Sequence, residues 1–144
     1  MEIAQQQDTL KKFLVVGYGN MAKAMVKPIT EEFDFTVVTP NSTPNFSCNL
    51  YRSFEELSNQ PETPVFDIVL FAVKPYHIDK VLDVFPADIF NNETQFISIL
   101  VGIERAYFRR RIAEGIKIAR VMPSLPVSVN KVRFLVAVFL STFI

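Results

Sequence analysis

The stretch of sequence that decides the fold is Lys12-Phe13-Leu14-Val15-Val16-Gly17-Tyr18-Gly19-Asn20-Met21-Ala22. It joins a short apolar run to the pattern Gly-x-Gly-x-x-Ala, and an Ala-rich segment follows. Such a pattern is typical of a buried parallel strand that leads into a helix through a dinucleotide-binding turn. Taken alone, the motif also fits an ordinary Gly-rich turn between a strand and a helix.

The small residues of this turn each have a physical reason in a dinucleotide site. Gly17 permits a tight turn, and Gly19 lets the backbone approach a pyrophosphate because it has no Cβ. Ala22 is small enough for the helix to pack closely against the strand. The N–H groups and the positive dipole end of the following helix would then face the phosphates.

Length and composition limit the classes of function. The 144 residues suffice for one domain with a sizeable core and are too few for two large ones. Apolar residues make up 49% and charged residues 21%, which is typical of a soluble globular protein. Fifteen basic residues balance fifteen acidic ones, so we expect no nucleic-acid partner, which would require clustered positive charge. Cys48 is the only cysteine, which excludes an internal disulfide and favours a reducing, cytoplasmic location.

Strand and helix patterns alternate along the middle of the chain, which predicts an α/β fold. We expect a doubly wound, mostly parallel sheet of Rossmann type with helices on both faces. The predicted strands cover residues 13–16, 35–39, 46–51, 67–73, 95–100 and 117–122. The predicted helices run from 20 to about 33, from a capping box at Ser53, from 75 to about 85 and from 103 to about 114. Pro28 should end or kink the first helix, and Gly115 should cap the last.

The residues after the second predicted strand bear on the choice of nicotinamide cofactor. An NAD site has an Asp or Glu about 20 residues beyond the glycines, which binds the ribose 2′-hydroxyl. This chain instead has Thr39-Pro40-Asn41-Ser42-Thr43, with no carboxylate to repel a 2′-phosphate and several donors that could bind one. The loop therefore favours NADPH. NADH remains possible, because the loop lacks the Arg that often marks an NADP site and ordinary turns use the same residues.

Three further segments follow predicted strands, at the edge where open α/β sheets bind ligands. Ala72-Val73-Lys74-Pro75 forms a stiff loop that could support a nicotinamide or a ribose, and Lys74 could lie near the cofactor or be solvated. Ser98 could touch the cofactor or be a small buried hydroxyl bonded to the backbone. Met122-Pro123-Ser124-Leu125-Pro126 could wall a substrate pocket or be a plain Pro-rich connection.

The single histidine and a group of four arginines give weaker indications of function. His77 fits a solvated surface position better than a catalytic one. Arg105, Arg109, Arg110 and Arg111 fit a solvated helix face better than a contact with an acidic partner. The sequence has no Cys/His cluster spaced for a metal ion, so we expect no metal site.

Taken together, four motifs in this order resemble the N-terminal cofactor domain of pyrroline-5-carboxylate reductase, the last enzyme of proline synthesis. They are Gly17-Tyr18-Gly19-Asn20-Met21-Ala22, Phe71-Ala72-Val73-Lys74-Pro75, Ile97-Ser98-Ile99-Leu100-Val101-Gly102-Ile103 and Arg120-Val121-Met122-Pro123-Ser124-Leu125-Pro126. Gly-x-Gly-Asn-Met-Ala combined with Ala-Val-Lys-Pro and Met-Pro-x-x-Pro is far more specific than any one of these motifs.

The resemblance implies NAD(P)H-dependent reduction of the cyclic imine 1-pyrroline-5-carboxylate to L-proline, with NADPH usually preferred. It implies Asn41 and Ser42 at the adenosine ribose or its phosphate, and Met122, Pro123 and Ser124 on the substrate side. The family more often has Asn at the position of Ser124. The cofactor-binding residues that it implies are Gly17, Tyr18, Gly19, Asn20, Met21, Ala22, Asn41, Ser42, Ala72, Val73, Lys74, Pro75 and Ser98.

The resemblance also sets the expected domains. Residues 1–10 are predicted to be a flexible tail with no secretory signal, and residues 11–130 the NAD(P)-binding domain. Family members are longer and add a helical domain that forms a homo-oligomer, and we expect that domain to be absent here. Residues 131–144 form a divergent apolar tail that is too short to span a bilayer. The tail could be an edge strand, a frameshift product or a partner-binding segment, of which the frameshift is favoured because the family pattern is lost near Asn130.

Three functions are compatible with these patterns. The first is a pyrroline-5-carboxylate reductase impaired by truncation, which should still bind NADPH. The second is a non-catalytic NADP(H)-binding remnant, or one half of a split enzyme. The third is another small NADP-dependent oxidoreductase, acting with coenzyme F420 or a hydroxy acid. It ranks last because such families are not expected to share Ala-Val-Lys-Pro together with Met-Pro-x-x-Pro.

Overall fold

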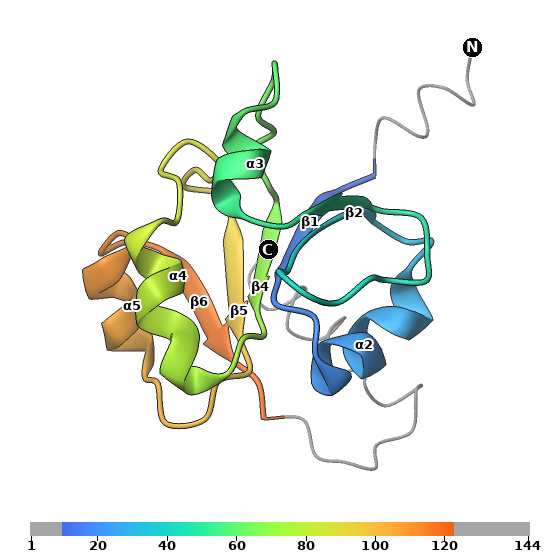
Figure 1. Ribbon diagram of the computed structural model, residues 1–144. Coiled ribbons are helices and arrows are strands. Elements are labelled where there is room, and N and C mark those ends of the chain that lie inside the picture. The colour runs from blue at the N-terminus through green and yellow to red at the C-terminus, as the bar shows by residue number, and fades with distance from the viewer. Residues whose placement is uncertain (1–9, 123–144) are drawn as a thin grey trace.

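The computed structural model describes residues 10–122, which form a six-stranded parallel sheet flanked by helices (Figure 1). The strands are β1 (Lys12–Val16), β2 (Asp34–Val38), β3 (Asn49–Tyr51), β4 (Ile68–Phe71), β5 (Gln95–Ser98) and β6 (Lys117–Arg120). The helices are α2 (Asn20–Val26), α3 (Phe54–Ser58), α4 (Ile78–Asp83) and α5 (Arg105–Arg111), with short 3-10 helices η1 (Lys27–Ile29) and η2 (Pro75–His77). The predicted α/β fold is confirmed.

The order of the strands across the sheet is β3-β2-β1-β4-β5-β6, and every neighbouring pair is parallel. The chain therefore builds outward from β1 to one edge, returns to the centre at β4 and builds outward to the other edge. In such a sheet the loops after the two central strands diverge, and ligands bind in the crevice between them. The topology thus places the candidate site before any side chain is considered.

Helices cover both faces of the sheet, as a doubly wound fold requires (Figure 1). On one face α2 contributes Met25 to a buried apolar cluster that includes Val15 from β1. On the other face Leu82 of α4 and Phe108 of α5 pack in a cluster with Val16. Alternate residues of β1 thus face opposite layers, and both are buried because both layers are apolar.

The first helix is shorter than the pattern alone would allow. α2 ends at Val26, and Pro28 lies in the 3-10 helix that follows. The proline ring clashes with the preceding helical turn and offers no N–H, so a continuous helix to residue 33 is disfavoured. The expected break at Pro28 is confirmed.

The capping box before α3 is also confirmed. The Ser53 hydroxyl accepts the backbone N–H of Glu56 at 3.1 Å, and the Glu56 carboxylate accepts the backbone N–H of Arg52. The predicted cap at Gly115 is wrong. α5 ends at Arg111, and Gly115 does not have the positive φ that a left-handed cap requires.

The expectations of no membrane span and no metal site can be compared with the described residues only, and the expectations for the C-terminal tail cannot be compared at all. Within residues 10–122, no helix is long and apolar enough to cross a membrane, and no three metal-ligating side chains gather. The tail predicted at residues 131–144 and the prolines of the Met-Pro-x-x-Pro motif lie outside the described residues.

Candidate functional site

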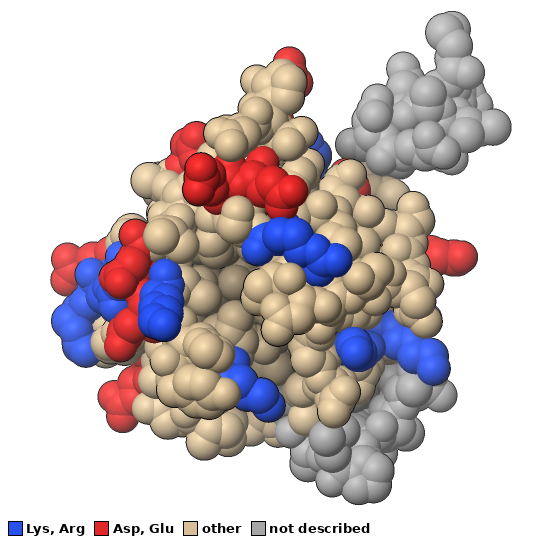
Figure 2. Space-filling model, viewed as in Figure 1, with Lys and Arg blue, Asp and Glu red and all other residues tan. Residues whose placement is uncertain are grey.

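A cavity of about 650 Å³ opens at the carboxyl edge of the sheet, where the loops after β1 and β4 diverge. Its volume is typical of a site for a small molecule or cofactor. In the space-filling view the molecule is hollowed near the centre, and Lys and Arg side chains lie beside the hollow (Figure 2). The cavity lies where the strand order predicts a ligand.

Gly17 sets the close contact between the β1 and β4 loops. Its φ is +86°, a conformation that side chains disfavour. A Cβ at Gly17 would lie 2.7 Å from Val73 Cγ1, 2.9 Å from Val73 N and 3.0 Å from the Ala72 carbonyl carbon. Glycine is therefore required at this position for two reasons. The turn has a positive φ, and the backbone of the neighbouring loop leaves no space for a Cβ.

The other residues of the glycine turn divide into two kinds. Tyr18, Gly19, Asn20 and Met21 line the cavity. Gly19 has an ordinary φ of −87°, and a Cβ there would meet no atom within 4 Å. Its missing side chain thus leaves open space beside the cavity. Ala22 is 1% exposed and packs in the core under α2, so its part is to let the helix approach the sheet.

The loop after β2 lines one end of the cavity through Thr39, Pro40, Asn41 and Ser42. Arg52, which follows β3, joins them there. Its guanidinium donates to the Ser42 carbonyl oxygen at 2.6 Å. The loop after β2 lacks an Arg, and Arg52, directly after β3, thus places one beside it.

Arg52 could have been found from the sequence. A short third strand was predicted to end at Tyr51, and β2 and β3 pair in parallel with Val38 opposite Tyr51. In a parallel pair, the residues that follow the two strands meet at the same edge. A basic residue directly after a predicted third strand therefore belongs with the loop after the second.

The opposite wall is formed by the β4 loop and the helix after it. The whole segment from Ala72 to Pro75 lines the cavity. His77 and Lys80 line it too, and His77 is exposed, as expected from the sequence. Residues three and four apart share a helix face, and Val81 and Val84 continue this lining.

Ser98 is not brought to the cavity. Its side chain is 1% exposed, and its hydroxyl accepts the Leu100 N–H at 3.2 Å. The neighbouring residues Ile99, Leu100 and Val101 line the cavity instead. Of the two alternatives for Ser98, this geometry fits the buried hydroxyl bonded to the backbone.

The predicted substrate side is described in part. Met122 lines the cavity and is 62% exposed, so an apolar side chain is presented at the rim. Pro123 and Ser124 lie outside the described residues.

The charges around the cavity have one sign. Its lining includes Arg52, Lys74 and Lys80, and it includes neither Asp nor Glu among the described residues. The whole chain carries fifteen residues of each sign, so this is a local concentration. Such a surface attracts anions.

Two weakly acidic groups lie close to the glycine turn. Burial, followed by the charge that Cys48 would carry as a thiolate, raises the pKa of Tyr18. Burial also raises the pKa of the Cys48 thiol. Both groups therefore stay neutral at neutral pH, and a protonated thiol is unreactive as a nucleophile.

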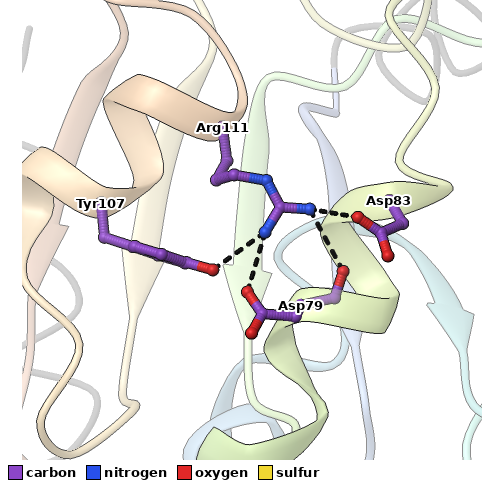
Figure 3. Close-up of polar contacts among 4 residues, drawn as sticks. All are labelled: Asp79, Asp83, Tyr107 and Arg111. Atoms are coloured by element: carbon purple, nitrogen blue, oxygen red, sulfur yellow. Dashed lines mark hydrogen bonds and ion pairs between the residues drawn. The ribbon is translucent and has the colours of Figure 1, made fainter.

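The wall formed by α4 is held from outside by Arg111 of α5 (Figure 3). Arg111 Nη1 donates to Asp79 Oδ1 at 2.8 Å and to the Tyr107 hydroxyl at 2.9 Å. Its Nη2 donates to the Asp79 carbonyl oxygen at 3.3 Å and pairs with the Asp83 carboxylate. The arginine is therefore a link between helices, which differs from the solvated position expected from its sequence.

Comparison with known proteins bears on what such a cavity binds. Residues 12–102 match the model of a protein family described as NADP oxidoreductase, coenzyme F420-dependent. The match covers β1 to β5 and hence both loops of the cavity. No curated protein sequence matches the chain significantly.

The fold is shared with many solved structures, including reductases of pyrroline-5-carboxylate. A pyrroline-5-carboxylate reductase from Coxiella burnetii aligns with a TM-score of 0.67 and 22% identity, over 84% of this chain and 47% of its own. A 1-pyrroline-5-carboxylate reductase from Streptococcus pyogenes aligns at 0.62 and 18%, over 92% and 56%. A Plasmodium falciparum pyrroline carboxylate reductase with NADP bound aligns at 0.61 and 25%, over 81% and 42%. The chain thus spans about half the length of these proteins.

Proposed function

The chain belongs to the family described as NADP oxidoreductase, coenzyme F420-dependent, and on this premise we propose that its cavity binds a nicotinamide dinucleotide, with NADPH preferred over NADH. The cavity lies at the switch point of the sheet, which is where dinucleotides bind in doubly wound folds. The substrate would meet the cofactor at the same edge.

The observation that carries this proposal is the charge of the cavity. Three cationic side chains and no carboxylate line it among the described residues, in a chain whose formal net charge is zero. The glycine turn contributes backbone close to the same space, with no side chain at Gly19 to fill it. A ligand with several phosphates and an extended shape satisfies both features.

Direct titration tests the cofactor proposal. The chain has no Trp, so the emission of NADPH itself can be followed without energy transfer from tryptophan. We expect saturable enhancement that NADP⁺ reverses by competition. Absence of saturable binding up to millimolar concentration would overturn the proposal.

We propose further that the substrate is a cyclic imine of the 1-pyrroline-5-carboxylate class and that the product is L-proline. The support is the order of four sequence motifs, together with a fold shared with reductases of that name. The bound cofactor supplies a hydride to the imine carbon, and the nitrogen takes a proton. The loop from Ala72 to Pro75 would support the nicotinamide, and Met122, Pro123 and Ser124 would face the imine.

A second candidate function is hydride exchange between NADP(H) and coenzyme F420. The description of the matched family favours it, over residues 12–102. The two functions share the cofactor half of the site and differ in the second substrate. Oxidation of NADPH that depends on 1-pyrroline-5-carboxylate supports the first, and reduction of F420 by NADPH supports the second. Saturable NADPH binding with neither reaction would favour the non-catalytic module. A cytoplasmic location remains a prediction.

A further inference from the structure

Arg52 lines the cavity and directly follows β3, a strand that lies outside the dinucleotide-binding motif. β3 pairs with β2 so that Tyr51 lies opposite Val38, and the Thr39 N–H donates to the Tyr51 carbonyl oxygen at 3.0 Å. The residue after Tyr51 is therefore beside the loop that follows β2. Arg52 and Ser42 both line the cavity there.

The guanidinium of Arg52 uses only part of its hydrogen-bonding capacity. Nη1 donates to the carbonyl oxygens of Ser42 at 2.6 Å and Thr39 at 3.3 Å, and Nη2 donates to Thr43 Oγ1 at 3.1 Å. A guanidinium has five N–H groups. Nε–H and the second N–H of Nη2 make no hydrogen bond within residues 10–122. In any arginine Nε–H and one N–H of Nη2 point the same way and form a fork that matches two oxygens of a phosphate, and Nε–H of Arg52 has no partner within residues 10–122.

The Arg52 guanidinium forms no ion pair with another described residue. Within residues 10–122 the ion pairs involve Arg111 and Lys117, and none involves Arg52. The Glu56 carboxylate accepts the backbone N–H of Arg52 and is committed to the start of α3. All three partners of the guanidinium are neutral, so they fix its position without cancelling its charge.

These observations identify the part of the cofactor that Arg52 would meet. In NAD sites a carboxylate after the second strand binds the 2′-hydroxyl of the adenosine ribose. Here that position is occupied by Thr39-Pro40-Asn41, and the cationic Arg52 lines the cavity beside this loop. A cation in place of the carboxylate favours a 2′-phosphate over a 2′-hydroxyl.

We propose that Arg52 binds the adenosine 2′-phosphate of NADP(H) and sets the preference of this site for NADP(H) over NAD(H). The inference rests on the proposed binding of a nicotinamide dinucleotide and adds the residue that selects between the two forms. The contacts of Arg52 with the β2 loop hold the fork in place before the cofactor arrives, which lowers the entropy cost of binding.

Two small probes test the inference without the nicotinamide. Adenosine 2′,5′-diphosphate carries the 2′-phosphate and 5′-ADP does not, and calorimetry on the full chain gives both dissociation constants. We expect the first to bind on the order of 10- to 100-fold more tightly. For Arg52→Gln we expect that advantage to disappear, while the affinities for 5′-ADP and NADH change less than about threefold. Arg52→Lys, which keeps the charge and loses the fork, should give an intermediate result.

A matched control is Arg105→Gln, because Arg105 is exposed on α5 and does not line the cavity. It should leave all affinities unchanged. Equal losses for both probes in Arg52→Gln would show that Arg52 only shapes the loop and would overturn the inference. Equal affinity of the unaltered chain for both probes would overturn it too, while leaving dinucleotide binding intact. Failure of the unaltered chain to bind any of these nucleotides would overturn the proposed function and the inference with it.

Discussion

Gly17, in the β1 loop, lies so close to Val73, in the β4 loop, that a Cβ at Gly17 would not fit between the two loops. A Cβ at Gly17 would lie 2.7 Å from Val73 Cγ1 and 2.9 Å from Val73 N. The side chain of Val73 can shift, whereas its backbone N is fixed by the loop that follows a central strand. The two loops that form the cavity are thus mutually dependent.

Gly17→Ala should therefore destabilise the fold. The positive φ costs about 1–2 kcal/mol for a residue with a Cβ, and overpacking adds about 1–3 kcal/mol. We expect a loss of roughly 2–4 kcal/mol in the free energy of unfolding, measured by urea denaturation.

Gly102→Ala is the control for that measurement. Gly102 has a nearly equal φ of +82°, but a Cβ there would meet nothing within 4 Å. It should cost only the conformational part, about 1–2 kcal/mol. Equal losses for the two variants would contradict the steric role of Val73, and Val73→Ala should partly rescue Gly17→Ala by removing Cγ1.

Gly19→Ala should separate ligand binding from folding. Gly19 has φ −87° and ψ −168°, which alanine adopts freely, and its Cβ would meet no atom within 4 Å. Stability should change by less than about 0.5 kcal/mol. The added methyl group would occupy space where the backbone meets the cofactor, so NADPH affinity should fall about tenfold or more.

Gly115→Ala is the matched substitution away from the cavity. Gly115 also has no atom within 4 Å of a Cβ and no positive φ, and it does not line the cavity. Both stability and NADPH affinity should be retained. If Gly19→Ala binds NADPH as tightly as Gly115→Ala does, the glycine turn is not part of the cofactor site.

The contrast between these glycines shows what could be predicted from the sequence. The motif identified Gly17 and Gly19 because its spacing reflects local geometry, a strand followed by a turn and a helix. It could not identify Val73, because the second reason for Gly17 comes from a loop that is distant in the sequence. The same limit explains Arg52, whose place at the site depends on the pairing of β3 with β2.

Periodicity predicted the elements better than their ends. All six strands and the break at Pro28 follow from apolar runs and from proline chemistry, which are local properties. The end of α5 was misjudged because a glycine near a helix end was taken as its cap. Arg111 was misjudged because its partners, Asp79 and Asp83, lie on another helix.

Alkaline pH should weaken the fold near the glycine turn. Burial raises the pKa of Cys48 above its ordinary value of 9.0 and that of Tyr18 above 10.0. The folded protein holds these protons more tightly than the unfolded chain does. Their contribution to stability is therefore complete below about pH 9 and is lost as pH rises through the folded pKa values.

Unfolding by urea between pH 8 and about pH 11 measures this effect. The free energy of unfolding of the unaltered chain should decline more steeply than that of Cys48→Ala or Tyr18→Phe, each of which removes one titrating group. Identical slopes in all three proteins would show that neither group titrates differently in the folded state.

Ser98→Ala should lower stability without weakening cofactor binding. The Ser98 hydroxyl is buried and accepts the Leu100 N–H, so its removal leaves a buried donor without a partner. Loss of a buried hydrogen bond of this kind costs about 1–2 kcal/mol. The side chain does not line the cavity, so NADPH affinity should stay within about threefold of that of the unaltered chain.

Thr94→Val is the matched comparison at the opposite end of β5. The Thr94 hydroxyl is also buried, donates to the Phe66 carbonyl oxygen at 2.7 Å and accepts the Asn91 N–H at 3.0 Å. Both variants should unfold at lower urea concentration, and both should bind NADPH normally. A loss of NADPH affinity in Ser98→Ala alone would instead show that the hydroxyl contacts the cofactor, which is the other alternative left open by its sequence position.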